Sequence, residues 1–125
     1  MPVPRVTKED LKQRLEAADA ASRPVIVDAR LKYPYEHSTV RLPGALRMAP
    51  EAIDPARLVR DRDIVVYDSD PDEVVSARVV ADLIGQGFRA AALEGGISGW
   101  MAANLPTEPK EALRQAPAAA GAARS

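Results

Sequence analysis

The sequence predicts an α/β domain with a parallel sheet of roughly five strands and helices on both faces. Two short, continuously apolar and β-branched segments, 25–27 and 64–67, are typical of strands that are covered on both sides. Between the second of these and a weaker strand at 91–93, residues 74–84 carry apolar side chains at helical spacing. Strand, helix and strand in this order form a βαβ unit, which requires parallel strands and a right-handed crossover.

Length and composition limit the class of protein. The chain has 125 residues, 46% hydrophobic and 28% charged, as expected of one soluble globular domain. The 17 basic and 18 acidic side chains give a formal net charge of -1, which argues against nucleic-acid binding. The chain has no cysteine, so disulfides, thiolate metal sites and cysteine nucleophiles are excluded. With neither a membrane-spanning apolar run nor a recognisable signal peptide, we expect a cytoplasmic protein.

The chain divides into a folded part, expected at 1–109, and an alanine-rich tail at 110–125. Residues 116–123 offer no large side chain for burial, which is typical of disordered segments. Thr7, followed by an acid at Asp10, marks the start of the first helix. This helix therefore precedes the first predicted strand.

Both predicted strands end at an aspartate, Asp28 and Asp68. Ligands of parallel α/β sheets bind outside this carboxyl edge. A loop leads from the second strand into the helix, and it consists of Asp68, Ser69, Asp70, Pro71, Asp72 and Glu73. Backbone N–H groups and the helix dipole favour an anion or a thiolate in such a loop, but here the loop's own carboxylates compete with an external anion. We expect Asp68 to accept loop N–H bonds and Asp70 to cap the helix, with Pro71 at its first position.

Five short motifs occur in order along the folded part. They are Val27-Asp28-Ala29-Arg30, Leu42-Pro43-Gly44-Ala45, Val65-Val66-Tyr67, Gly87-Phe88, and Leu93-Glu94-Gly95-Gly96-Ile97 with Trp100. In order and spacing they resemble the rhodanese family of sulfurtransferases. The resemblance implies a rhodanese-like fold over nearly the whole folded part, with Asp28 and Arg30 tying the strand end to neighbouring loops.

The resemblance also implies a cysteine directly after Val65-Val66-Tyr67, which carries a persulfide in active members. This chain has Asp68 there, and Asp70 stands where one subgroup has a second cysteine. A carboxylate forms no stable persulfide, so sulfur transfer cannot pass through Asp68. A further departure is Thr39-Val40-Arg41, which replaces the family's Gly-His before the Pro-Gly-Ala turn.

The sequence therefore predicts an inactive rhodanese homologue that acts as a binding or regulatory module. We expect an unidentified protein or a small anion as its partner, and neither a cofactor, a metal, a nucleic acid nor a membrane. A competing hypothesis is an enzyme with altered chemistry that uses Asp68 as a base or metal ligand. Two more hypotheses are weak binding of Mg²⁺ or Ca²⁺ by the acidic loop and an accessory role beside an active sulfurtransferase. The spacing Asp68-Ser69-Asp70 also superficially matches haloacid-dehalogenase phosphotransferases, although Asp72 stands where that family usually has Thr or Val.

Residues outside the loop give weaker indications. His37, Tyr33 and Tyr35 are expected in an exposed surface loop, where the tyrosines are the better candidates for partner contact. Trp100 is expected to anchor a short helix on the core. Three arginines are candidates for an anion-attracting cluster, although scattered or ion-paired arginines are the expected state: Arg30, Arg41 and Arg47.

Overall fold

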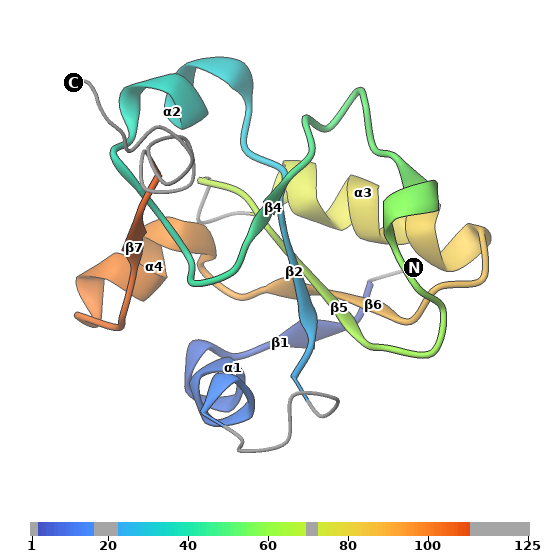
Figure 1. Cartoon of the computed structure of the whole chain (residues 1–125), viewed down its shortest axis with the longest axis horizontal. Helices are drawn as coiled ribbons and strands as arrows, with labels where there is room; N and C mark the ends of the chain where they lie inside the picture. Colours follow the sequence, from blue (N-terminus) through green and yellow to red (C-terminus); the bar gives the residue numbers. More distant parts are fainter. Residues whose placement is uncertain (1–2, 17–22, 70–72, 111–125) are drawn as a thin grey trace, which may run out of the picture.

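A five-stranded parallel sheet forms the centre of the protein in the computed structural model, which describes residues 3–16, 23–69 and 73–110 (Figure 1). The strand order is β1-β6-β5-β2-β4, and every neighbouring pair is parallel. The bounds are β1 (Arg5–Val6), β6 (Ala90–Leu93), β5 (Ile64–Tyr67), β2 (Val25–Asp28) and β4 (Leu46–Arg47). The predicted fold class is therefore confirmed.

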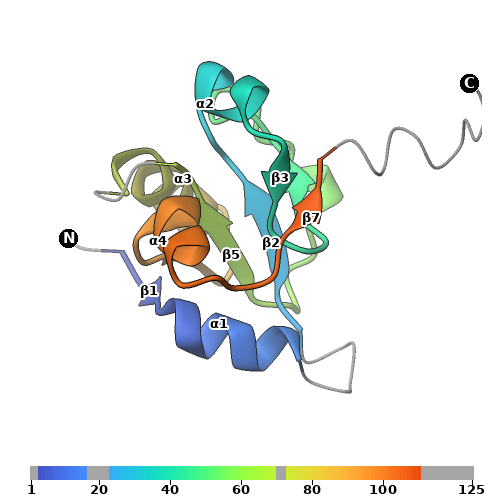
Figure 2. The same cartoon turned by 90° about the vertical axis from the view of Figure 1, so that its left-hand side faces the viewer.

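Helices cover both faces of this sheet. In Figure 1, α3 (Val74–Gly85) lies on one side of the strands, and α1 (Lys8–Leu15) and α4 (Gly96–Ala102) lie on the other. The remaining elements are a short helix α2 (Lys32–His37), a 3₁₀ helix η2 (Pro55–Arg57), and the strands β3 (Val40–Arg41) and β7 (Glu108–Pro109). β3 and β7 form a separate antiparallel pair, which Figure 2 shows below α2.

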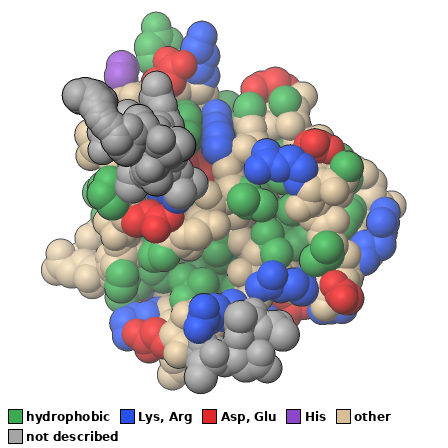
Figure 3. All heavy atoms as spheres, viewed as in Figure 1, with side chains coloured by type: hydrophobic (Ala, Val, Ile, Leu, Met, Phe, Trp, Pro, Cys, Tyr) green, Lys and Arg blue, Asp and Glu red, His purple; other side chains and the backbone are tan. Residues whose placement is uncertain are grey.

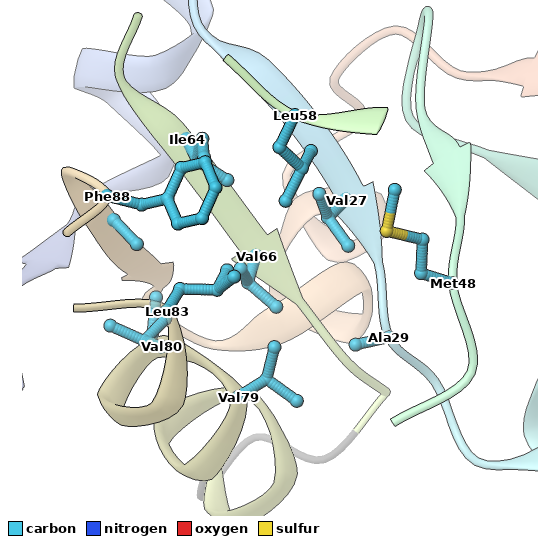
Figure 4. Packing of buried hydrophobic residues seen from close by; sticks show 12 residues of the cluster. Val27, Ala29, Met48, Leu58, Ile64, Val66, Val79, Val80, Leu83 and Phe88 are labelled. Carbon is cyan, nitrogen blue, oxygen red and sulfur yellow. The ribbon is translucent and has the colours of Figure 1, made fainter. Parts of the chain in front are cut away.

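The register of the strands separates two hydrophobic cores, because successive strand residues point to opposite faces. Val27 of β2 pairs with Val66 of β5, and both belong to the core that α3 covers (Figure 4). Val79, Val80 and Leu83 of α3 complete this core. The next residues along the strands, such as Ile26, face the opposite core beneath α1 and α4. Burial on both faces explains why these strands are continuously apolar.

The ends of the helices follow local signals only in part. Thr7 caps α1 as predicted, because its hydroxyl accepts the Asp10 N–H at 3.1 Å. Trp100 anchors α4 as predicted, since its ring is buried and its Nε1–H donates to the Pro106 carbonyl at 2.7 Å. The predicted start of α3 at Asp70 and Pro71 is wrong, because the helix begins at Val74.

Two predicted segments lie wholly or largely outside the described residues. The first is the middle of the loop before α3, residues 70–72. The second is the predicted tail at 110–125, of which only Lys110 is described. The backbone N–H of Lys110 donates to the Thr39 carbonyl at 2.9 Å. Within the described ranges, no helix has both the length and the apolar character that a membrane span requires.

Candidate functional site

The candidate site lies at the carboxyl edge of the sheet. Asp28 at the end of β2 lies beside Tyr67 at the end of β5, and beside Arg47 at the end of β4 on its other side. Asp68 follows Tyr67 directly and opens the loop to α3. The parallel topology therefore brings the two strand-end aspartates to one edge, as the sequence predicts.

Asp68 is buried against the start of α3, with 1% of its surface exposed. Its Oδ2 accepts the backbone N–H of Ser76 at 2.7 Å. Ser76 lies in the first turn of α3, where N–H groups have no partner within the helix. The carboxylate therefore uses one of the N–H groups that an external anion would otherwise bind.

The backbone of Asp68 is also fixed, by the first residues of α4. The Asp68 carbonyl accepts the Ile97 N–H at 2.9 Å. A Cβ atom on Gly96 would lie 2.4 Å from that carbonyl oxygen, and Gly96 has a φ of +59°. Only glycine fits both the distance and the backbone conformation. Glycine at position 96 is therefore required for α4 to pack directly against Asp68.

Glu73 closes the other end of the loop. It has a left-handed φ of 63°, and its side chain makes no cap bond to α3. Its carboxylate instead accepts two hydrogen bonds from Arg5 of β1, both at 2.6 Å, and one from the Gly95 N–H at 3.0 Å. The pKa of Glu73 is lowered by the Arg5 bond first and by the Gly95 N–H as well, against the opposing effect of burial. This tertiary clamp explains why the helix starts later than its local sequence signals predict.

Asp28 and Arg30 form an ion pair in which both side chains are 1% exposed. The guanidinium binds the carboxylate through Nε at 2.9 Å and through a terminal nitrogen at 2.7 Å. Tyr67 donates its hydroxyl to Asp28 at 2.9 Å and accepts the Leu42 N–H at 3.3 Å. Burial, with the Asp28 charge, raises the pKa of Tyr67 far above its ordinary value, so the hydroxyl remains a donor. The network joins the ends of β2 and β5 to the turn that follows β3.

The arginines that the sequence singles out lie in two places. Arg47 donates to the carbonyls of Asp28 and Arg30 at 3.2 and 2.6 Å, and so joins the edge network. Arg41 instead binds the Ala45 carbonyl at 2.9 Å and pairs with Glu108 at 2.5 Å. The structure therefore brings Arg30 and Arg47 together and keeps Arg41 with β7.

The predicted exposed loop at 33–37 is a helix, α2, and its two tyrosines differ. Tyr33 is 72% exposed, and its ring lies 5.4 Å from that of the exposed His37. Tyr35 is half-buried, because its ring packs against Arg47 at 4.0 Å and Lys110 at 4.1 Å. The expectation that both tyrosines are exposed is wrong for Tyr35, since the cations that cover it come from distant parts of the chain.

The acidic residues do not form a cation site within the described parts of the chain. No group of three or more His, Asp or Glu side chains lies close enough there to hold a metal ion. Asp70 and Asp72, on which the weak Mg²⁺ or Ca²⁺ hypothesis depends, lie outside the described residues.

The architecture and the loop define a class of protein, namely a parallel α/β domain with a strand-to-helix loop at its carboxyl edge. The family model of the rhodanese-like domain matches residues 7–103. The chain therefore belongs to the rhodanese-like domain family, as its five motifs predict. Comparison with curated protein sequences found no significant match.

Solved structures support the same fold. A protein from Anabaena sp. is 28% identical, with a TM-score of 0.70 over 89% of this chain and 87% of its own. A rhodanese-like domain protein from Staphylococcus aureus is 26% identical, with a TM-score of 0.64 over 78% of this chain and 90% of its own. A thiosulfate sulfurtransferase from Pseudomonas aeruginosa is 23% identical, with a TM-score of 0.68; the match covers 85% of this chain and 19% of that enzyme. At this identity the last likeness shows the fold alone.

Substitution of Arg30 tests the buried pair. In Arg30→Gln the Asp28 carboxylate stays buried without its guanidinium, so we expect the free energy of unfolding to fall by about 3–5 kcal/mol. Urea unfolding followed by circular dichroism measures the loss. The control is Arg89→Gln, because Arg89 is 59% exposed and pairs with Asp63 at 2.7 Å; we expect less than about 1 kcal/mol there. Equal losses in the two variants would contradict the structural role of the pair.

Titration of Glu73 tests the clamp on the loop. Its pKa in the folded protein lies below the ordinary value of 4.5, so the clamp contributes its full stability above that pH and loses it as the pH falls through the folded pKa. We expect Glu73→Gln to be less stable than the natural protein at pH 7, with a difference that shrinks under acid conditions. Urea unfolding between neutral and acid pH measures this difference. Glu9→Gln, at a side chain that is 73% exposed, should show no such trend; a constant deficit in Glu73→Gln would count against the clamp.

Proposed function

We propose that this rhodanese-like protein is inactive in sulfur transfer and works as a binding or regulatory module. The observation that carries the proposal is the state of Asp68, which stands at the position where the family resemblance places the persulfide-carrying cysteine. Its carboxylate is buried and accepts the Ser76 N–H at 2.7 Å. The chain has no cysteine at any position, so no other thiol takes over this role.

The electrostatics of the loop support an inactive site. A sulfur donor such as thiosulfate is an anion, and a fixed carboxylate at the carboxyl edge repels it. Asp68 also uses an N–H group of the first turn of α3, which an anion would otherwise bind. Both effects act against the family reaction even before the missing sulfur atom is considered.

Altered chemistry at Asp68 has less support from the geometry. A general base has to come within hydrogen-bond reach of a substrate proton, yet Asp68 is 1% exposed and Gly96 lies directly against its backbone. An accessory role beside an active sulfurtransferase is one form of the binding role, and it leaves Asp68 without chemistry of its own.

A sulfur-transfer assay tests the proposal directly. Purified protein with thiosulfate and cyanide should form thiocyanate no faster than the blank, because neither a thiol nor a persulfide is available. A rhodanese-like enzyme that has its cysteine serves as the positive control. Turnover clearly above the blank would refute the inactive role.

Restoration of the sulfur atom tests whether the loop still provides its N–H groups. Asp68→Cys introduces one thiol into a chain that has none, so its ultraviolet titration reports a single group. We expect the pKa of this thiol to lie below the ordinary value of about 8.5, because the Ser76 N–H and the start of α3 stabilise a thiolate. The control is Met101→Cys, at an exposed position of α4, where the ordinary value is expected. Identical pKa values in both variants would mean that the N–H groups at the start of α3 do not stabilise a thiolate at position 68.

A further inference from the structure

A group of cations surrounds Tyr35 at the carboxyl edge of the sheet. The Arg47 guanidinium lies 4.0 Å from the centre of the Tyr35 ring, the Lys110 ammonium 4.1 Å and the Arg30 guanidinium 5.3 Å. Lys110 also donates a hydrogen bond to the Tyr35 carbonyl. Attraction between cations and the ring holds these charges together. We name the side chains of Tyr35, Arg47 and Lys110 the Tyr35 patch.

The positive charge of the Tyr35 patch is only partly neutralised. Asp28 already binds Arg30 and Tyr67, and it lies 3.8 Å from the nearest Arg47 nitrogen. Within the described parts of the chain, no ion pair joins Lys110 to an acidic side chain. Among the ion pairs of the described residues, Asp28 is the only carboxylate that pairs with Arg30 or Arg47, and the partly exposed Arg47 and Lys110 carry the remaining positive charge.

The Arg47 guanidinium is fixed by contacts with its neighbours. One terminal nitrogen donates to the carbonyls of Asp28 and Arg30, and the guanidinium lies over the ring of Tyr35. The remaining N–H groups of Arg47 have no bond to the described residues, and a quarter of the side chain is exposed. A guanidinium fixed in this way matches a carboxylate and loses little conformational entropy when it binds one.

Exposed apolar side chains lie on the same segment of the chain as Tyr35. Leu31 is 48% exposed and precedes Tyr35 by four residues, which places it on the same side of α2. Tyr33 is 72% exposed, but it precedes Tyr35 by two residues and lies on a different side of the helix. Figure 3 shows hydrophobic, basic and acidic side chains at the surface over α2. A free phosphate would use only the charges, whereas a peptide that combines acidic and apolar side chains would use both kinds of surface.

By composition, the chain beyond Lys110 has no excess of acidic side chains. Residues 111–125 contain one acidic side chain, Glu111, and two basic ones, Arg114 and Arg124. Their balance has the same sign as the Tyr35 patch, so charge complementarity favours a different molecule.

We propose that the Tyr35 patch binds an acidic segment of a partner protein that also carries apolar side chains, with Leu31 contacting the apolar part. The inference rests on the binding role proposed above and names the chemistry of the partner. The site does not include Asp68, and its carboxylate-binding group is Arg47.

Fluorescence anisotropy with a defined probe tests this inference. The probe is a fluorescein-labelled peptide that combines glutamate with phenylalanine and leucine, compared with the same peptide carrying glutamine for glutamate. We expect the acidic peptide to bind more tightly, with an affinity that falls as salt is added. Arg47→Gln should weaken binding by about tenfold, because one charge-assisted hydrogen-bonding group is lost. Lys110→Gln should weaken it in the same direction, and it keeps the test valid if Arg47→Gln fails to fold.

A matched control is Arg57→Gln, because Arg57 is an exposed arginine outside the Tyr35 patch. Its affinity for the acidic peptide should be that of the natural protein. Equal binding of the two peptides, or an equal loss in the control, would overturn the inference. Displacement of the peptide by inorganic phosphate at the same concentration would also overturn it, as would self-association of the protein that Arg47→Gln abolishes. None of these outcomes bears on sulfur transfer, so a failure here and a failure of the proposed inactive role are told apart.

Discussion

The buried ion pair between Asp28 and Arg30 is the constraint on which the carboxyl edge of the sheet depends. Two opposite charges with 1% exposure are tolerated only when their hydrogen-bonding groups are satisfied. The Tyr67 hydroxyl donates a further hydrogen bond to the Asp28 carboxylate, and the Val40 carbonyl accepts one from the Arg30 guanidinium at 3.1 Å. Because Tyr67 is the last residue of β5, the same network fixes the point at which the loop to α3 begins.

The loop that begins there is held at both ends by carboxylates of its own. Asp68 binds the first turn of α3, and Glu73 binds Arg5 and the Gly95 N–H. At least one N–H group of the first turn of α3, that of Ser76, thereby stabilises the fold. The fold of the family is thus kept while the carboxylates of this loop, Asp68 and Glu73, have structural partners.

Local patterns predict three of the strands, β2, β5 and β6, together with the cap at Thr7 and the family, because those features depend on neighbouring residues or on short motifs. The two-residue strands β1, β3, β4 and β7 carry no such pattern. The sequence also predicts that Asp68 lies against the start of a helix, since this follows from the strand-to-helix order. It does not predict the start of α3, because Glu73 is bound to Arg5, which is 68 residues away. The surroundings of Tyr35 were missed for the same reason: Lys110 lies 75 residues along the chain. Pairings of this kind leave no periodic signal in the sequence.

The contact between Gly96 and Asp68 has a consequence for any relative with another residue at position 68. The atom that excludes a side chain at position 96 is the backbone oxygen of residue 68, and every amino acid has that oxygen. The steric demand for glycine is therefore indifferent to whether residue 68 is a nucleophile. A Gly-Gly pair in this turn indicates that α4 packs closely against the end of β5. It gives no information about whether the protein turns over a substrate.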